Sequence, residues 1–289
     1  MMSLDHKIDF AVVLTVHKAN PNGDPLNGNR PRQDYDGHGE ISDVAIKRKI
    51  RNRLLDMGEM VFVQSNDKQI DGYSSLKERA EAHPELVKLL QEKQDMSDRF
   101  ASVACLEWID VRSFGQVFSF KGKAKGKGVS VGVRGPVSIH TATSIDSIDI
   151  SSMQITKSVN SETSEGKGSD TMGMKHRVDF GVYVFYGSIN TQLAKKTQFS
   201  NEDAEKIKEA LRTLFVNDVS SARPEGSMEV YKVYWWEHSS KLGQYSSAKV
   251  HRALKIKSKT DEPKTIDDYA IELDDSVIQG LKVEVIDGI

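Results

Sequence analysis

Apolar and polar side chains alternate along the chain from Ile8 to His17. Every second residue of this segment is isoleucine, phenylalanine, leucine or valine, which is the period of a strand with one buried face. The alternation ends at the segment Asn20-Pro-Asn-Gly-Asp-Pro25, because its prolines and its Asn-Gly pair favour turns. We therefore predict a strand over 8–17 and a long loop from there to Glu40.

A helical period follows this loop. Ser42 or Asp43 is expected to cap the helix, and Gly58 to end it after Met57. The apolar residues of this stretch fall on one narrow arc at about 100° per residue, and they are Ile46, Ile50, Leu54 and Met57. Cations flank the arc, with Lys47, Arg48 and Arg51 on one side and Lys49 and Arg53 on the other. The pattern predicts a helix that packs on a sheet through its apolar arc and exposes a basic surface.

Further elements follow the same rules. A second amphipathic helix is expected over 201–216 after Ser200, and 78–92 is expected to form two helical pieces separated at Pro84. Strands are predicted at 103–111, 116–120, 129–133, 137–140, 178–186, 228–236 and 281–286. A strand, a helix, several strands, a second helix and a final strand are compatible with an α+β fold built on a ferredoxin-like sheet with an insertion.

The composition indicates an ordinary globular chain. It has 289 residues, of which 38% are hydrophobic and 28% charged, enough to bury a core without disulfides. Cys105 is the only cysteine, so an internal disulfide and a multi-cysteine zinc site are excluded, and we expect its thiol to be buried. Apolar runs are too short for a membrane span or a signal segment. We expect a cytoplasmic protein that does not bind membranes.

The distribution of charge changes this picture, although the net charge is only -2. Between Val111 and Ile145 the chain has no acidic residue and six basic ones, namely Arg112, Lys121, Lys123, Lys125, Lys127 and Arg134. From Asp261 to the end it has nine acidic residues and two lysines. Such segregation gives a near-neutral molecule one surface that attracts phosphate and another that is acidic.

Patterns typical of enzymes are missing. The eight histidines are not spaced as metal ligands, and no His-Glu-x-x-His, Cys-x-x-Cys or Gly-x-Ser-x-Gly pattern occurs. The segment 122–128 is one residue too short for a nucleotide phosphate loop and lacks its Ser or Thr. Its alternating lysines could instead contact a nucleic-acid backbone or simply solvate a hairpin tip. We predict no catalytic activity, no metal and no cofactor.

The loop before the basic helix has two possible roles. Asp24, Asp34 and Asp36 could bind magnesium or transfer a proton during RNA cleavage, but aspartates in such positions more often cap turns. Arg30 and Arg32 could bind phosphate through two parallel hydrogen bonds.

Two further segments suggest contacts with bases. Aromatic residues Tyr231, Tyr234, Trp235 and Trp236 could stack on them, although neighbouring side chains of a strand point to opposite faces, so at least half should lie in the core. The segment 158–173 is rich in small, polar and charged residues between apolar strands, and we interpret it as a projecting arm.

Four segments taken together resemble the Cas7 superfamily. They are Asn20-Pro-Asn-Gly-Asp-Pro25, Ile41-Ser-Asp-Val-Ala-Ile-Lys-Arg-Lys-Ile-Arg51, Asp110-Val-Arg-Ser-Phe-Gly115 and Ser220-Ser-Ala-Arg-Pro-Glu-Gly226. The similarity is closest to the backbone subunit of the type I-C CRISPR Cascade complex and covers about 8–236.

This resemblance implies a modified RNA-recognition-motif-like palm with inserted finger and thumb elements. It implies one domain over 1–289, with a helical insertion at about 60–100 and a thumb arm at about 158–173. Copies of such a subunit stack helically on crRNA, present it for pairing with target DNA and contact other Cascade subunits. The aromatic-rich Lys/Arg-Gly-Phe-Gly-Phe strand of RNA-recognition motifs is absent, so base stacking on the sheet is not expected.

The resemblance also assigns roles to particular residues. Ser42, Lys47 and Arg51 match the helix positions that hold RNA phosphates. Including the candidates above, the residues predicted to bind RNA are Asn20, Asn22, Arg30, Arg32, Ser42, Lys47, Arg48, Arg51, Lys121, Lys123, Lys125, Lys127, Arg134, Met172, Met174, Lys175, His176 and Arg223. The methionines are expected beside the thumb, and Arg134, Lys175 and His176 in the palm. Two alternatives remain open: a type III-like backbone subunit that cleaves target RNA with a loop aspartate, and a general module for single-stranded RNA.

Overall fold

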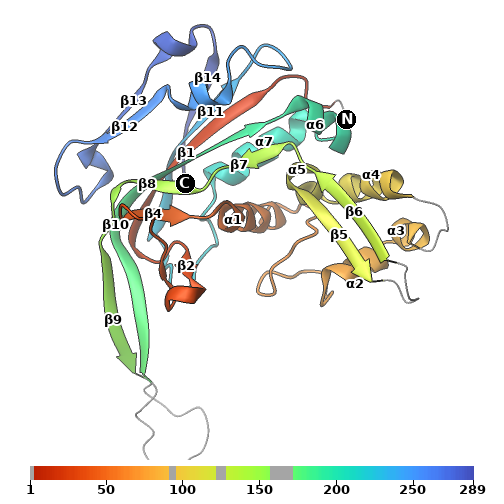
Figure 1. Cartoon of the computed structure of the whole chain (residues 1–289), viewed down its shortest axis with the longest axis horizontal. Coiled ribbons are helices and arrows are strands. Elements are labelled where there is room, and N and C mark those ends of the chain that lie inside the picture. Colours follow the sequence, from red (N-terminus) through yellow and green to blue (C-terminus); the bar gives the residue numbers. More distant parts are fainter. Residues whose placement is uncertain (1–2, 91–95, 122–127, 157–171) are drawn as a thin grey trace, which may run out of the picture.

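An antiparallel sheet forms the centre of the computed structural model, which describes residues 3–90, 96–121, 128–156 and 172–289. For residues 120, 121, 128 and 129 it describes the backbone only. Eight strands of the described residues belong to it: β1 (Ile8–Ala19), β4 (His38–Ile41), β7 (Val137–Ile139), β8 (Ala142–Ser147), β9 (Ile150–Thr156), β10 (Met172–Ile189), β11 (Met228–Glu237) and β14 (Lys282–Asp287). Their order is β14-β11-β1-β10-β8-β4, and β7 and β9 also pair with β10 (Figure 1).

Shorter elements surround this sheet. Three two-stranded sheets pair β2 (Gly23–Asp24) with β3 (Arg30–Pro31), β5 (Gly115–Lys121) with β6 (Gly128–Arg134), and β12 (Leu254–Ser258) with β13 (Tyr269–Leu273). The α-helices are α1 (Asp43–Asp56), α2 (Leu76–Ala82), α3 (Pro84–Leu89), α4 (Ser97–Glu107), α5 (Ile109–Phe114), α6 (Thr191–Thr197), α7 (Asn201–Arg212) and α8 (Ser247–His251). Short 3-10 turns occur at Pro25–Asn27, Ile266–Asp268 and Asp275–Ile278.

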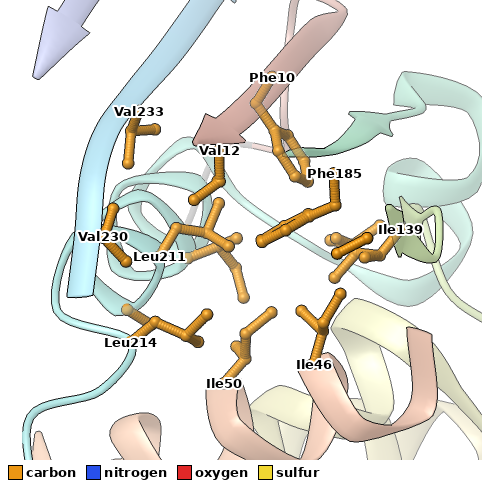
Figure 2. Packing of buried hydrophobic residues seen from close by; sticks show 14 of the residues in the cluster. Phe10, Val12, Ile46, Ile50, Ile139, Phe185, Leu211, Leu214, Val230 and Val233 are labelled. Atoms are coloured by element: carbon orange, nitrogen blue, oxygen red, sulfur yellow. The ribbon is translucent and has the colours of Figure 1, made fainter. Parts of the chain in front are cut away.

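The helices α1 and α7 pack on one face of the sheet. Ser42 caps α1, since its hydroxyl accepts the N–H of Ala45 at 3.3 Å. Figure 2 shows the core beneath, where Ile46 and Ile50 of α1 meet residues of β1, β10, β11 and the α7 segment. The predicted apolar arc of α1 is therefore confirmed. Along the chain the main elements follow in the order β1, α1, β8, β10, α7, β11, which is a β-α-β-β-α-β pattern. In the sheet, the four strands of this pattern lie side by side in the order β11-β1-β10-β8.

The C-terminal segment covers the opposite face of the sheet. Tyr234 and Trp236 of β11 pack there against Val250, Leu254 and Tyr269. For the same reason Ala11 and Val13 of β1 are fully buried, so the prediction that β1 is buried on one face only was wrong. Trp235 is buried on the helix side, so three of the four aromatic residues considered for base stacking belong to the cores.

Residues between α1 and β7 form a third hydrophobic core. Phe62, Phe100, Trp108, Phe118 and Val131 meet in it. The prediction of a strand over 103–111 was wrong, because α4 and α5 occupy this segment. The apolar residues at 100, 103 and 104 follow helical spacing, which outweighed the strand preference of the valines and the tryptophan.

Most other predicted elements are present. The predicted strands at 8–17, 116–120, 129–133, 137–140, 178–186, 228–236 and 281–286 correspond to β1, β5, β6, β7, β10, β11 and β14, and the break between α2 and α3 lies at Pro84 as predicted. Strands β2, β3 and β4 lie inside the predicted loop, and β8, β9, β12 and β13 were not predicted. Cys105 is buried as predicted, and burial raises the pKa of its thiol to about 12. Among the helices that the structure describes, none has the length and apolar character of a membrane span.

Candidate nucleic-acid interface

The loop after β1 is fastened to the start of α1. The amide oxygen of Asn22 accepts the backbone N–H of Ser42 at 2.9 Å, and the backbone N–H of Arg32 donates to the carbonyl of Asn22 at 3.1 Å. Asn20 is buried and donates through Nδ2 to the carbonyl of Asn29 at 2.7 Å. A Cβ at Gly23 would lie 1.9 Å from the side-chain oxygen of Asn29, so a larger residue there would displace this side chain. In the RNA-free chain, Asn20 and Asn22 therefore hold the loop in place through hydrogen bonds within the protein.

A cleft of about 190 Å³ lies between this loop, α1 and the segment 217–223. It is lined by Pro21, Asn22, Gly23, Ala45, Arg48, Lys49, Asn52, Asp67, Lys68, Asn217, Asp218, Val219, Ser220 and Arg223. The cleft thus brings together three predicted RNA-binding residues, Asn22, Arg48 and Arg223, from segments far apart in the sequence. It also contains Lys49 and Lys68, which were not predicted to bind RNA.

Lys49 is buried at the back of the cleft. Only 7% of its side chain is exposed, its ammonium forms an ion pair with Asp218, and it lies 5.4 Å from the centre of the Phe215 ring. Burial lowers the pKa of Lys49 to about 8, and the neighbouring Asp218 carboxylate opposes this effect. The same carboxylate oxygen accepts Nε of Arg223 at 3.1 Å. One aspartate therefore serves two cations.

The other cations of α1 also have acidic partners. Nζ of Lys47 lies 3.0 Å from a carboxylate oxygen of Asp43, one turn earlier, and an Nη atom of Arg48 lies 3.0 Å from Asp67. Arg48 remains 60% exposed and Lys47 23% exposed. Among the ion-paired cations of α1, these two side chains are the most exposed.

Arg51 has a different environment, although it lies one turn after Lys47. Its Nε donates to Asp110 at 2.9 Å, and its guanidinium carbon lies 5.1 Å from the centre of the Phe114 ring. Asp110 is only 1% exposed and also accepts the backbone N–H groups of Phe62 and Val63, at 2.7 and 3.1 Å. Arg51 therefore ties α1 to the third core, and the segment Asp110-Val-Arg-Ser-Phe-Gly115 supplies the partners.

A second hollow, of about 290 Å³, lies in the loop itself and is lined by Asp24, Asn27, Arg30, Pro31, Arg32, Gln33 and Glu40. Arg32 lies 3.4 Å from Asp24, whose carboxylate caps the turn at Leu26. Asp34 accepts the N–H groups of Asp36 and His38, both at 2.9 Å. Asp24 and Asp34 therefore cap turns, as one interpretation predicted. In the described ranges, no group of three or more His, Cys, Asp or Glu side chains is placed to hold a metal.

Strands β9 and β10 project from the body as a long hairpin (Figure 1). Met172 and Met174, 62% and 55% exposed, lie on one face of it. Lys175 is half-buried, and His176 is buried with Nδ1 2.7 Å from the hydroxyl of Ser152. The predicted arm at 158–173 falls almost wholly outside the described residues.

Strands β5 and β6 flank the lysine-rich residues 122–127 in the sequence. Arg134 is exposed at the end of β6, in a two-stranded sheet that is separate from the central sheet, and its predicted role in RNA binding stays a prediction. The side chain of Lys121 and residues Lys123, Lys125 and Lys127 lie outside the described part of the chain. Their predicted contact with RNA stays a prediction.

The fold and the cleft together define a class of protein. It is a mixed α/β protein with a central antiparallel sheet, a second helical region with its own core, and a basic helix beside a cation-lined cleft. The family model described as "CRISPR-associated protein Cas7" matches residues 6–274. Since this match spans most of the chain, the protein belongs to the Cas7 family, and the predicted resemblance is confirmed at that level.

Individual proteins of known name or structure share low sequence identity with this chain. A curated protein described as "CRISPR-associated protein Cas7" from Haloferax volcanii is 26% identical over 220 residues, which cover 71% of this chain and 63% of that relative. A chain of a solved "CRISPR RNA-guided surveillance complex, pre-nicking" is 15% identical, with a TM-score of 0.49 and coverage of 80% of this chain and 78% of the other. A chain of a "CRISPR RNA-guided surveillance complex" is 16% identical, with a TM-score of 0.46 and coverage of 80% and 68%.

Proposed function

We propose that this chain is the guide-RNA-binding backbone subunit of a type I-C CRISPR surveillance complex in the cytoplasm. Copies of the chain stack along one crRNA and hold its backbone, while the guide bases pair with target DNA. Other Cascade subunits complete the assembly. The subunit itself has no catalytic activity and needs no cofactor.

The observation that carries this proposal is the convergence of cations from α1 and two distant loops on one cleft. Arg48, Lys49, Lys68 and Arg223 all line it. Lysine and arginine contacts to phosphates are independent of base sequence. A subunit that must hold guides of any sequence needs this kind of contact, because base pairing and not protein reads the target.

The sheet supports the same role. In the proposal it is an RNA-recognition-like palm within one domain over 1–289, the region at about 60–100 is a helical insertion, and 158–173 with its supporting hairpin is the thumb. The C-terminal segment covers the face of the sheet opposite α1 and α7. This cover occupies the sheet face on which RNA bases could otherwise stack. In the proposal the RNA is instead held by its backbone, so its bases remain free for pairing.

The four sequence segments noted above support the type I-C assignment over a type III-like one. Asp24 and Asp34, two candidates for RNA cleavage, accept backbone N–H groups of their own turns. This use of their oxygens supports a subunit that does not cleave RNA. A magnesium-dependent cleavage assay on complementary RNA, repeated with each of Asp24, Asp34 and Asp36 changed to alanine, tests this part of the proposal.

The main experiment is electron microscopy of the purified chain mixed with single-stranded RNAs of increasing length. We expect filaments or arcs whose length increases with the RNA and whose formation does not depend on base sequence. Complexes of one chain per RNA at every length would support a general RNA-binding module instead. Absence of RNA binding would refute the proposal altogether.

A further inference from the structure

The carboxylate of Asp218 lies where a phosphate oxygen would be expected in a cation-lined site. One of its oxygens is shared by the ammonium of Lys49 and by Nε of Arg223. Two cations that converge on one oxygen can bind a phosphate oxygen as well as a carboxylate oxygen, because both anions accept charge-assisted hydrogen bonds. Both cations line the cleft beside α1, and Asp218 lines it with them.

The cleft has more positive than negative charge. Four cationic side chains line it, namely Arg48, Lys49, Lys68 and Arg223, against the two carboxylates of Asp67 and Asp218. The amides of Asn22, Asn52 and Asn217 add neutral donors. Lys68 also pairs at 3.3 Å with Asp56, which does not line the cleft, so the four cations have three carboxylate partners. An anion that enters this cleft therefore meets an excess of one positive charge.

The buried lysine shows the same imbalance. The pKa of Lys49 is lowered to about 8, chiefly by burial and also by nearby Arg223, and Asp218 offsets only part of these effects. A second negative group near Lys49 would therefore be favourable.

The segment that carries Asp218 is held on both sides by backbone contacts. Lys68 donates to the carbonyl of Asn217 at 2.9 Å, and the N–H of Asn20 donates to the carbonyl of Ala222 at 2.9 Å. These contacts fix the backbone of the segment without using the Asp218 side chain, which is 15% exposed.

We propose that this cleft is a phosphodiester subsite for single-stranded RNA, and that Asp218 occupies it in the RNA-free chain as an internal substitute for the phosphate. The inference rests on the proposed function and adds a regulatory element to it. RNA must displace the carboxylate from Arg223 in order to bind. Asp218 thereby lowers the affinity for RNA and for other polyanions, which keeps the cleft closed to weak ligands.

The test compares the full-length chain with Asp218→Asn and with Asp287→Asn, using oligouridine of guide length as the probe. Asp287 is 81% exposed on β14, where it pairs with Lys232, so its variant changes the net charge equally at a distant surface site. Fluorescence anisotropy gives the Kd at several salt concentrations. We expect Asp218→Asn to bind severalfold more tightly at low salt, with the slope of log Kd against log salt steeper by about 0.7, the value for one added phosphate contact on a single strand. We expect Asp287→Asn to keep the wild-type slope.

A second variant keeps the test decisive if Asp218→Asn does not fold. Arg48→Gln removes a cleft cation that is 60% exposed, so folding should be unaffected. It should weaken binding and make the slope shallower by about 0.7. Wild-type slopes in every variant that folds would overturn the inference while leaving the proposed function intact, whereas a wild-type chain that fails to bind oligouridine would refute the proposed function.

Discussion

Replacing Lys49 by methionine should remove a contribution to stability that increases with pH above neutrality. The pKa of this lysine falls from 10.5 to about 8 on folding, because burial removes water from the ammonium. This difference corresponds to about 3 kcal/mol. Between these two pH values the unfolded chain holds the proton and the folded chain has released it, so the free energy of unfolding rises with pH. Relative to Lys49→Met, the wild type should gain about 3 kcal/mol across this window.

The measurement is urea unfolding, followed by tryptophan fluorescence, of wild type and variant between about pH 7 and about pH 10. Buried Cys105 and Tyr186 have raised pKa values and destabilise the fold in the same window, but their effect cancels in the difference between the two proteins. Lys255→Met is the matched control. Asp274 raises the pKa of Lys255, so the stabilising effect of Lys255 is lost, not gained, as pH rises through its folded pKa. A flat difference between wild type and Lys49→Met would refute the reasoning.

Three further predictions follow from the contacts described above. Asp110→Asn should lower the free energy of unfolding by about 3–5 kcal/mol, measured in urea, because it leaves Arg51 without its buried partner; a change within the error of a surface variant would contradict this role. Leu211→Ala should cost about 2–5 kcal/mol and lower Tm, because Leu211 is fully buried between α7 and the sheet; an unchanged Tm would mean that the core collapses around the cavity. Lys47→Ala should weaken RNA binding equally for unrelated sequences, with a salt slope shallower by about 0.7; a loss confined to particular sequences in anisotropy titrations would point to base contacts instead.

Local periodicity predicted the elements that form the central layers. The apolar arc of α1 needed only the spacing of Ile46, Ile50 and Leu54, and the predicted N-cap at Ser42 makes its hydrogen bond. The segment 103–111 failed because valine and tryptophan favour strands, whereas the packing of the third core selected a helix. Strands β12 and β13 have five residues each, and β12 does alternate, since Leu254 and Ile256 are more buried than Lys255 and Lys257, but this short signal was missed.

The ion pairs of the candidate interface could not be predicted in the same way. Lys49 and Asp218 are 169 residues apart in the sequence, and Arg51 and Asp110 are 59 apart. No local pattern connects such residues, because the pairing depends on how the helix docks. Sequence reasoning could therefore identify a basic helix, but it could not identify which cations the fold itself uses.

Burial separates the cations of α1 that can contact RNA from those that position the helix. Arg48 and Lys47 form partly exposed pairs, and an exposed pair contributes only about 0–1 kcal/mol, so a phosphate can replace its carboxylate at little cost. Arg51 pairs with an aspartate that is 1% exposed, and breaking such a pair costs several times more. Besides Lys49, which lies at the back of the cleft, phosphate contacts along α1 should therefore come from Lys47 and Arg48. Arg51 acts by holding the helix against the third core, so its replacement should impair RNA binding only as far as it impairs stability.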